Sequence, residues 1–451
     1  GEEILKLVAV GGGSSYTPEL VEGLIMRQKE YPVGELWLVD IPQGHWKLET
    51  VAALARRMVA RADVDIKIYS SQDRCLALEN ADFVISQFRV GQIEARILDE
   101  TIPAKYGLLG QETNGAGGMM NGLRTIPEVF KLIEDCQRLC PNAWLINFTN
   151  PAGMITEAVF RYTNWKRFIG LCNVPIGMEM ALAKVLDVDR ERLRIDFAGL
   201  NHMVFGLDVF LDGISIANKV LAMVGQQSPA MSMNNIEDIP WSPAFLQGLG
   251  AIPCPYHRYY FQKDEMLEHA LEDYRRGASR GQVVKALEEE LFKRYSDPQL
   301  DIKPLELEQR GGAYYSDAAC NLMASIYTDK GDIQPVNTIN NGAIADLPND
   351  VVVEVSSVIT KEGPRPLAMG SLPEACRGLV QQLKANELLA CKAAVSGSYE
   401  EALAAMVTNP LVQSEKLGAA VLDELLLAHS QYLPQFKKAI EAVRKRHALN
   451  S

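Results

Sequence analysis

Several features that define other classes of protein are missing from this chain. Its 451 residues contain no uninterrupted apolar run long enough to span a bilayer and no signal-peptide pattern, so we expect a cytoplasmic protein. Its eight cysteines follow no framework spacing, which in a chain of this length indicates reduced thiols and not disulfides. Six of them are predicted to be packing residues: Cys75, Cys136, Cys140, Cys320, Cys376 and Cys391.

Basic residues are fewer than acidic residues. Lysine and arginine together number 45 against 57 aspartate and glutamate residues, which gives a formal net charge of −12. A general nucleic-acid or anionic-membrane surface needs basic patches that replace counterions, so neither partner is expected, although a local anion site is compatible with this charge. The sequence also has no internal repeat or low-complexity tract, and its 47% hydrophobic and 23% charged residues are typical of a globular protein with two or three domains.

A glycine-rich turn follows the first apolar run. The β-rich residues 4–10 are followed at once by Gly-Gly-Gly-Ser-Ser-Tyr-Thr-Pro at 11–18, with Thr17 as the expected N-cap and Pro18 in the first helical turn. This order of strand, turn and helix is typical of a dinucleotide-binding unit, although the third glycine of the full fingerprint is missing. The next strand, 35–39, ends in Asp40, where an acidic residue would bind the ribose of NAD and repel the phosphate of NADP.

Further alternation of strands and helices follows. We expect a helix at 46–62, a strand at 65–69, a short helix near Leu76 and a strand at 82–90, which together predict a doubly wound parallel sheet of the Rossmann type. Polar residues near the end of the last strand would lie at the carboxyl edge of that sheet. The glycine-rich stretch 107–122 is predicted to be a functional loop beside the crevice. The candidate cofactor-binding residues are Gly11, Gly13, Ser14, Ser15, Asp40, Gln87, Arg89 and Asn150.

Three apolar runs between residues 144 and 202 end in polar groups. The runs are 144–151, 170–175 and 199–202, and each is typical of a buried parallel strand that delivers side chains to the carboxyl edge of a sheet. Their polar ends include two amides, a thiol and an imidazole, a donor set for a divalent cation with sugar-type hydroxyls as further partners. Cys172 and His202 are the candidate metal ligands, although a single buried Cys or His is more often a packing residue. Asn150 and Pro151 also indicate a helix start, with Asn150 as cap and Pro151 at the first position.

The second half of the chain becomes richer in helices. Asp212-Gly213 predicts a hairpin, and residues 225–235 predict an exposed connection. The stretch 253–260, Pro-Cys-Pro-Tyr-His-Arg-Tyr-Tyr, is a dense cluster of potential acid/base groups. Its two prolines would hold Tyr256 rigidly. A helix is expected at 281–295, opened by Arg280. Helices from 373 to 447 are expected to pack on the second domain and to supply oligomer contacts.

Five ordered motifs resemble those of glycoside hydrolase family 4. They are Gly-Gly-Gly-Ser-Ser-Tyr-Thr-Pro-Glu at 11–19, Gly-Gln-Glu-Thr-Asn-Gly at 110–115, Asn-Phe-Thr-Asn-Pro at 147–151, Leu-Cys-Asn-Val-Pro at 171–175 and Gly-Leu-Asn-His at 199–202, and the similarity extends to 310–316. The resemblance implies an NAD-binding Rossmann domain, residues 1–173, and a mixed α/β, helix-rich second domain, residues 174–451, as in lactate and malate dehydrogenases. The motifs are most similar to the branch that hydrolyses 6-phospho-β-glucosides, such as 6-phosphocellobiose.

The resemblance also implies roles for single residues. Cys172 and His202 would bind Mn²⁺ or a similar divalent ion, and Tyr256 would be the general base. The residues implied to contact substrate are Arg96 and Arg280, at its phosphate, and Asn150 and Asn173. Relatives that act on α-linked substrates tend to carry Asp where this chain has Asn173, which favours a β-linked substrate and leaves the general acid unassigned.

The chemistry implied by the family accounts for this residue set. Removal of a hydride from carbon 3 of the sugar to NAD⁺ gives a ketone, which acidifies the proton on carbon 2 and which a cation polarises. Tyr256 then takes the proton, the aglycone is eliminated, water adds, and the hydride returns, so that NAD is recycled. The expected partner is a small phosphorylated disaccharide or glucoside, and the expected assembly is a homodimer or homotetramer.

Three other functions stay open on the sequence alone. A 2-hydroxyacid dehydrogenase would share the Rossmann half, but it needs no Cys/His pair and would produce NADH. An NAD-sensing regulatory protein would keep residues 11–40 but would have no use for Tyr256. A phospho-α-glycosidase of the same family would differ at Asn173.

Overall fold

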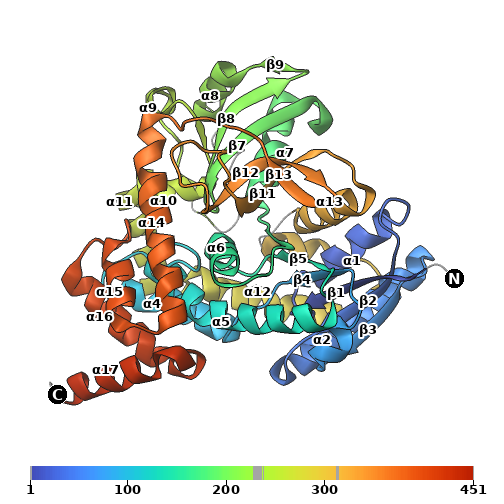
Figure 1. Ribbon diagram of the computed structural model, residues 1–451, viewed down its shortest axis with the longest axis horizontal. Coiled ribbons are helices and arrows are strands. Elements are labelled where there is room, and N and C mark those ends of the chain that lie inside the picture. The colour runs from blue at the N-terminus through green and yellow to red at the C-terminus, as the bar shows by residue number, and fades with distance from the viewer. Residues whose placement is uncertain (1–2, 227–235, 237, 311–313, 450–451) are drawn as a thin grey trace.

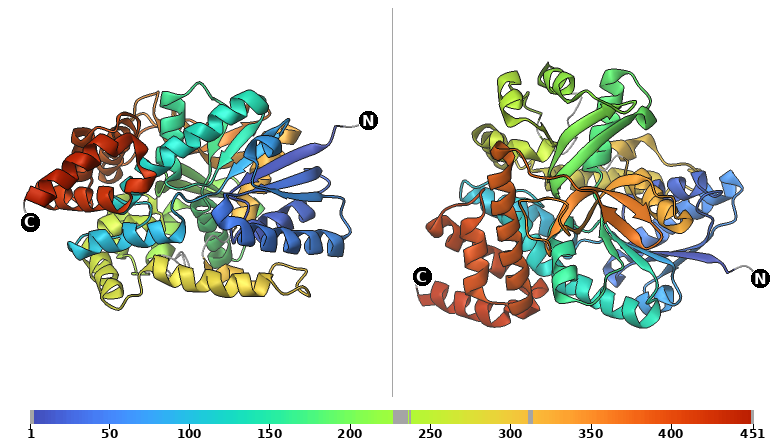
Figure 2. Two further views of the ribbon diagram at one scale, coloured as in Figure 1. Left: turned by 90° about the horizontal axis from the view of Figure 1, so that it is seen from below. Right: turned by 45° about the horizontal axis from the view of Figure 1, so that its top comes forward.

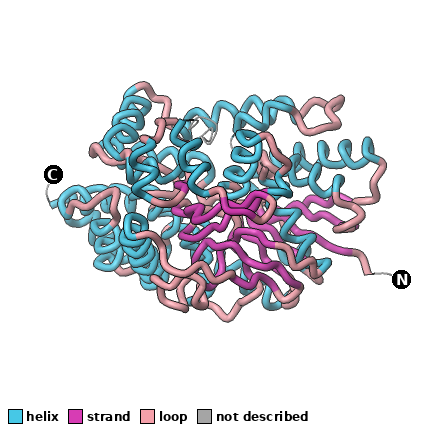
Figure 3. Tube along the Cα trace, turned by 90° about the horizontal axis from the view of Figure 1, so that it is seen from above, coloured by secondary structure: helices cyan, strands magenta, loops and turns pink. Residues whose placement is uncertain are grey.

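The computed structural model of the chain describes residues 3–226, 236, 238–310 and 314–449 (Figure 1). Within this part, thirteen strands belong to one sheet, and helices pack on both of its sides (Figures 2 and 3). None of the described helices combines the length and apolarity needed to cross a membrane. The strands are β1 Leu5–Val10, β2 Val33–Val39, β3 Lys67–Ser71, β4 Phe83–Ser86, β5 Trp144–Asn147, β6 Phe168–Gly170, β7 Leu193–Leu200, β8 Met203–Leu211, β9 Ile214–Ser215, β10 Ile252–Pro253, β11 Ile333–Ile339, β12 Val352–Thr360 and β13 Gly363–Pro366.

The helices connect these strands and form the C-terminal end of the chain. The α-helices are α1 Thr17–Met26, α2 His45–Ala62, α3 Arg74–Leu78, α4 Gln92–Lys105, α5 Gly115–Leu139, α6 Ala152–Tyr162, α7 Val174–Leu186, α8 Ala217–Gln226, α9 Pro243–Leu249, α10 Arg258–Phe261, α11 Lys263–Arg275, α12 Arg280–Tyr295, α13 Tyr315–Thr328, α14 Glu374–Ser396, α15 Tyr399–Thr408, α16 Glu415–Ala428 and α17 Lys437–Leu449. The predicted connection at 225–235 lies outside the described residues from 227 onward.

The first six strands form the predicted parallel sheet. Their order is β3-β2-β1-β4-β5-β6, and each neighbouring pair is parallel. Both faces of the central strands are covered, which explains why β4 and β5 are apolar and fully buried. The order reverses between β1 and β4, and ligands of open α/β sheets bind at such a reversal, at the carboxyl ends of the strands. The prediction of a Rossmann-type sheet is confirmed.

The remaining strands extend this sheet in antiparallel fashion. β11 pairs with β6 through Asn337 and Gly170, and β12, β7, β8 and β10 follow in that order. The prediction of β7 as a third parallel strand is therefore wrong. Only two residues, Asn201 and His202, separate it from β8, and so short a connection joins antiparallel strands. The hairpin predicted at Asp212-Gly213 is present between β8 and β9.

The predicted loop at 107–122 is helical from Gly115 onward, because α5 begins there. Two of its glycines, Gly117 and Gly118, are required for close packing. A Cβ atom on Gly117 would lie 2.4 Å from the carbonyl oxygens of Asp99 and Gln111, and one on Gly118 would lie 2.2 Å from the backbone of Thr113. These glycines let α5 pack directly against α4 and the loop that precedes it.

Two predicted helix caps are also wrong. The carbonyl of Tyr16, and not that of Thr17, accepts the first hydrogen bonds of α1. The Thr17 hydroxyl instead donates to the Gly12 carbonyl at 2.8 Å, which ties the glycine turn to the helix. Similarly, α6 begins at Ala152 with Pro151 as its N-cap, because the Pro151 carbonyl accepts from the amide of Ile155. Asn150 precedes that cap and lies on the wall of the cavity described below.

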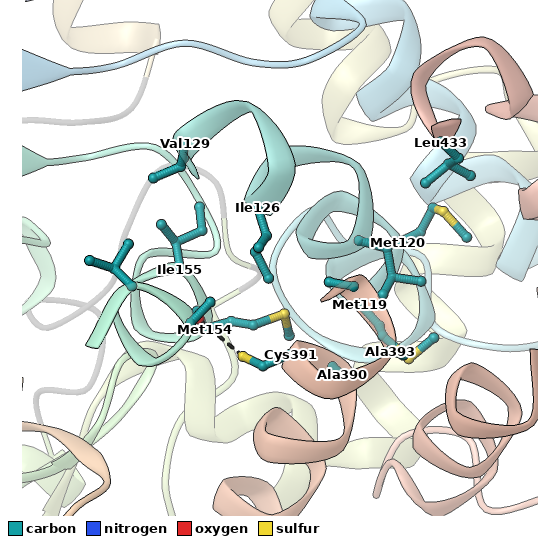
Figure 4. Close-up of a cluster of buried hydrophobic side chains, with 14 of the residues drawn as sticks. Met119, Met120, Ile126, Val129, Met154, Ile155, Ala390, Cys391, Ala393 and Leu433 are labelled. Atoms are coloured by element: carbon teal, nitrogen blue, oxygen red, sulfur yellow. Dashed lines mark hydrogen bonds between the residues drawn. The ribbon is translucent and has the colours of Figure 1, made fainter. Parts of the chain in front are cut away.

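The C-terminal helices do not pack only on the second half, as the sequence had predicted. Buried side chains of α14, α15 and α16 share one hydrophobic core with α5, α6 and the first strands. Figure 4 shows Ala390, Cys391 and Ala393 of α14 among residues of α5 and α6, and the Cys391 thiol donates to the Met154 carbonyl at 3.3 Å. The C-terminal helices therefore complete the hydrophobic core of the N-terminal half of the chain.

The cysteines are free thiols, as predicted. Of the six predicted packing residues, five are buried. Cys75 is the exception, because it lies exposed at the start of α3 and accepts a hydrogen bond from Arg138.

Candidate active site

A cavity of about 830 Å³ lies at the carboxyl ends of the parallel strands. Its wall includes all fourteen residues that the sequence indicates as candidates for binding or catalysis. They are Gly11, Gly13, Ser14, Ser15, Asp40, Gln87, Arg89, Arg96, Asn150, Cys172, Asn173, His202, Tyr256 and Arg280. The structure thus brings these residues together in one place, while the role of each stays a prediction.

The glycine turn forms one end of the cavity. Gly11 has a positive φ of 87°, and a Cβ atom there would lie 2.6 Å from the Gln87 carbonyl. The carboxylate of Asp40 accepts from the amides of Gly13 and Ile41, both at 2.9 Å. Burial raises the pKa of Asp40, and these two amides act against that rise. The turn is therefore held as bare backbone at the N-terminus of α1, an arrangement that suits an anionic ligand such as a pyrophosphate.

A hydrogen-bonded group lies between the glycine turn and α13. The amide of Gln87 donates to Thr17 Oγ1 at 3.1 Å and to the Gly11 carbonyl at 3.3 Å, and its oxygen accepts from the Tyr315 hydroxyl. The Tyr315 ring also contacts Phe148, at 4.2 Å between ring centroids. The sequence did not single out Tyr315 or Phe148, although both belong to the motifs that it identified.

Two buried residues, Arg96 and Glu112, form a cluster with the half-buried Arg89 on the wall of the cavity. Arg89 Nη2 lies 2.6 Å from Glu112 Oε2, and Arg96 Nη1 lies 3.4 Å from the same oxygen. Burial raises the pKa of Glu112, but Arg96 and Arg89 outweigh it and hold that pKa well below its usual value. Arg89 Nη1 and Arg96 Nε are buried without a hydrogen-bond acceptor among the described residues. These donors favour an anionic ligand here.

Two further arginines adjoin the cluster from the second half of the chain. Arg280 donates to the Arg310 carbonyl at 3.4 Å, and burial, together with the positive charges of Arg96 and Arg310, lowers its pKa. Arg310 itself lies 3.1 Å from Glu288. Several guanidinium groups converge on one wall, and a phosphate is a ligand that such groups bind well. The sequence did not predict Arg310 or Glu112 as site residues, although each lies in a motif noted for the family.

The thiol of Cys172 and the imidazole of His202 lie on the same cavity wall. Cys172 follows β6, its sulfur accepts from the Val174 amide at 3.5 Å, and burial raises its pKa. His202 lies in the hairpin turn between β7 and β8 with a positive φ of 60°. Burial lowers the pKa of His202 to about 4, so its ring is neutral at physiological pH. The ring stacks on Tyr256, with 3.8 Å between centroids and 6° between planes.

The buried carboxyl group of Glu354 is linked to the thiol of Cys172 through Asn201. Glu354 Oε2 accepts from Asn337 at 2.7 Å and from Asn201 at 3.3 Å, and Asn201 also hydrogen-bonds Cys172. Burial raises the pKa of Glu354 to about 7. Sequence reasoning missed Glu354, because it lies inside an apolar strand and becomes a neighbour of Cys172 only through the pairing of β12 with β7 and β11.

The donor set fits a divalent cation in part. A thiolate and a neutral imidazole are good ligands for transition metals, and both line the cavity. In the part of the chain that the structure describes, no three His, Cys, Asp or Glu side chains gather as a metal site. The protein would therefore supply two such ligands at most, and a bound metal would need oxygens from substrate, water or the amides of Asn150 and Asn173.

Comparison with known families identifies the chain. Residues 6–188 match the family 4 glycosyl hydrolase model, and residues 197–412 match the model of the family 4 glycosyl hydrolase C-terminal domain. The chain belongs to glycoside hydrolase family 4.

Its relatives within the family are similar over nearly their whole length. A probable 6-phospho-beta-glucosidase of Bacillus subtilis is 60% identical over 97% of this chain and 99% of its own, and a 6-phospho-beta-glucosidase of Escherichia coli is 48% identical over 98% and 99%. The 6-phospho-beta-glucosidase of Thermotoga maritima, solved with manganese, NAD⁺ and glucose-6-phosphate, superposes with a TM-score of 0.85 at 33% identity and covers 95% of this chain and 99% of its own. The fold, although not the function, is also that of malate dehydrogenase from Cryptosporidium parvum, at a TM-score of 0.52 and 15% identity.

Proposed function

We propose that this protein is a 6-phospho-β-glucosidase that requires NAD⁺ and a divalent metal, with Mn²⁺ as the first choice. The observation that carries this proposal is the single cavity that joins the glycine turn, the arginine cluster and the group Cys172, His202 and Tyr256. A 2-hydroxyacid dehydrogenase would use the first of these and could use arginines for its carboxylate substrate, but it needs no Cys172 and His202 pair. Full-length similarity to 6-phospho-β-glucosidases of two bacteria supports the same function.

The groups that we propose to bind NAD⁺ lie at the first end of the cavity. The amides of the glycine turn and the N-terminus of α1 would hold the pyrophosphate. Asp40 would hold the ribose and disfavour the extra phosphate of NADP. Gln87, which fixes the turn through Gly11, and Asn150 would lie towards the nicotinamide.

The sugar and its phosphate would occupy the other end. Arg96 and Arg280 would hold the phosphate, and Asn150 and Asn173 would hold sugar hydroxyls, with Cys172 and His202 as the protein's metal ligands. When bound, NAD⁺ supplies a reversible hydride acceptor for carbon 3 and the metal supplies a Lewis acid for the resulting ketone. Tyr256, placed by its stack on His202, would then take the proton from carbon 2.

Isotope exchange tests this mechanism directly. Elimination through a carbon 2 carbanion predicts that product formed in deuterated water carries deuterium at carbon 2, and that a substrate deuterated there reacts more slowly. Direct displacement at carbon 1 by paired carboxylates breaks no bond to that hydrogen and predicts neither result. Tyr256→Phe should suppress the exchange while NAD⁺ and Mn²⁺ still bind. Product without label from the wild-type enzyme would contradict the elimination mechanism.

Omission of each component tests the requirements. We expect turnover of a chromogenic 6-phospho-β-glucoside to need both NAD⁺ and Mn²⁺, without net NADH, and the matching α-glucoside to react far more slowly. Cys172→Ser and His202→Ala should lose activation by Mn²⁺ but keep NAD⁺ binding, because the two sets of residues lie on different strand ends. Wild-type activation in both variants would remove the metal assignment.

The setting of the enzyme is also a proposal. We place it in the cytoplasm as a homodimer or homotetramer, so that light scattering should give two or four times the mass of one chain. The division into residues 1–173 and 174–451 is likewise a proposal.

A further inference from the structure

The ring of His202 is held from the side by a hydroxyl group. Its Nδ1 atom lies 2.8 Å from Oγ1 of Thr113, a residue of the segment between α4 and α5. A neutral imidazole carries its hydrogen on either Nδ1 or Nε2, and the partner of Nδ1 decides between the two forms. The question is therefore whether Thr113 donates to His202 or accepts from it.

The other partners of Thr113 answer this question. Its hydroxyl lies 2.9 Å from Gln111 Oε1. Three N–H groups donate to that same atom: the backbone amides of Thr113 and Asn114, at 2.6 and 2.9 Å, and Asn114 Nδ2, at 3.2 Å. Two backbone donors identify the atom as the amide oxygen, which can only accept. These N–H groups already use the lone pairs of Gln111 Oε1, so the O···O distance places the hydroxyl hydrogen of Thr113: without a hydrogen between them, two oxygen atoms would face each other at 2.9 Å.

The hydroxyl oxygen of Thr113 then accepts hydrogen bonds from its other two neighbours. It accepts from Asn114 Nδ2 at 3.2 Å and from His202 Nδ1, which uses both of its lone pairs. The hydrogen of the His202 ring is thereby placed on Nδ1, and the lone pair is left on Nε2. Gln111 is itself fixed by its bonds to the backbone and by a hydrogen bond to Tyr259.

We propose that Thr113, oriented by Gln111, is a positioning residue that fixes His202 in the Nδ1–H form and presents Nε2 as the metal-binding atom. The inference rests on the proposed function in that it takes His202 as a metal ligand. Metal-bound histidines generally donate their other N–H to a fixed acceptor, and loss of that acceptor typically weakens metal binding 10- to 100-fold. The stack on Tyr256 fixes the plane of the ring, and Thr113 fixes its hydrogen.

The first experiment observes the hydrogen itself in the metal-free protein. The chain has six histidines, so ¹⁵N-histidine labelling gives a small set of ring signals, and the one lost in His202→Asn belongs to His202. Long-range ¹H–¹⁵N spectra of the wild type at neutral pH should give a protonated Nδ1 and an unprotonated Nε2. A protonated Nε2 would overturn the inference, whether or not the protein binds a metal.

The second experiment measures Mn²⁺ affinity by electron paramagnetic resonance of free Mn²⁺. Thr113→Val removes the hydroxyl at nearly constant volume and should weaken Mn²⁺ binding about 10- to 100-fold, whereas Thr113→Ser keeps the hydroxyl and should bind within about twofold of the wild type. Thr101→Val is the matched control, because Thr101 is also half-buried and its hydroxyl bonds only the Ile97 carbonyl in the described structure. Wild-type Mn²⁺ affinity in Thr113→Val would overturn the inference.

Failure of this inference and failure of the proposed function give different results. If His202 is not a metal ligand, His202→Asn binds Mn²⁺ as the wild type does, while the spectra still report the Nδ1–H form. If His202 is a ligand but Thr113 does not position it, His202→Asn loses Mn²⁺ and Thr113→Val keeps it.

Discussion

Single residues in this site carry charges that are buried and balanced against one another. Arg96 is only 2% exposed and lies between Glu100 and Glu112. Removal of one partner from such a group leaves the other charges buried without compensation, which is more harmful than removal of an exposed ion pair. The phosphate-binding role that we propose for Arg96 would therefore be combined with a structural role in one side chain.

This combination predicts different results for two arginines. Arg96→Met should lower the free energy of unfolding by about 3 to 5 kcal/mol, because Glu100 and Glu112 lose their shared cation. Arg280→Met should change stability much less, since Arg280 is partly exposed, but should weaken binding of the phosphorylated glucoside at least tenfold. Urea unfolding and calorimetric titration of substrate and NAD⁺ check both. Equal losses of substrate and NAD⁺ affinity in Arg280→Met would argue against a phosphate site there.

Glu354 predicts a dependence of stability on pH. Because burial raises its pKa from 4.5 to about 7, the folded protein holds this proton over a range where the unfolded chain has released it. Stability should therefore fall as pH rises from about 4.5 to about 7, by at most about 3 kcal/mol. Glu354→Gln keeps acceptors for Asn337 and Asn201 and should remove this fall. Urea unfolding of both proteins at pH 5 and pH 8 provides the measurement, and a constant difference between them would contradict the assignment.

Among the helices, α5 packs closely against its neighbours because it has glycines at the contacts. A methyl group at Gly117 would meet the Asp99 and Gln111 carbonyls at 2.4 Å, so Gly117→Ala should lower the free energy of unfolding by about 1 to 3 kcal/mol. Gly378 in α14 is exposed and has open space around its Cβ position, so Gly378→Ala should raise that free energy by about 0.5 to 1 kcal/mol. Thermal unfolding of the two variants gives the comparison. Similar effects would show that close packing is not the reason for Gly117.

The elements that the sequence predicted well are those with a local signal. Strands β1, β2 and β5 combine an apolar run with a following turn or helix, and the glycine turn precedes α1 in a characteristic order. The bounds of β6 were predicted less well, because it ends at Gly170, where the predicted run begins. The start of α5 and the direction of β7 were missed, because Gly117 resembles a loop residue until its neighbours are known and β7 ends like a parallel strand. Arg310 lies in a stretch that resembles the family, although no role was predicted for it, whereas Glu354 enters the site through tertiary pairing alone. No pattern along the chain indicates such a pairing.

In the whole molecule, the two halves of the chain share both sheet and core. The sheet continues from β6 into β11 without a break, and the C-terminal helices complete the core around α5. Strand pairing and core packing therefore both cross the domain boundary that we propose between residues 173 and 174.

This sharing predicts that the chain does not tolerate loss of its C-terminus. A chain that ends at residue 372 lacks α14 to α17 and uncovers apolar residues such as Met120 and Ile155. We expect it to be insoluble, or to bind a hydrophobic dye strongly and to lose NAD⁺ binding, although the glycine turn lies far away in the sequence. A chain that ends at residue 449 is the control and should behave as the full chain does. Cooperative unfolding and NAD⁺ binding by the shorter chain would show that the first half folds by itself.

The late position of α14 matters for synthesis on the ribosome. The faces of α5 and α6 that it covers emerge first, and α14 follows α6 by roughly 200 residues, or about 10 to 40 s at ordinary rates of translation. During that time the nascent chain exposes a strip of Met, Ile and Leu side chains that has no partner within its own length. Such a strip is a substrate for holding chaperones. The yield of active enzyme should therefore fall when the supply of those chaperones is reduced.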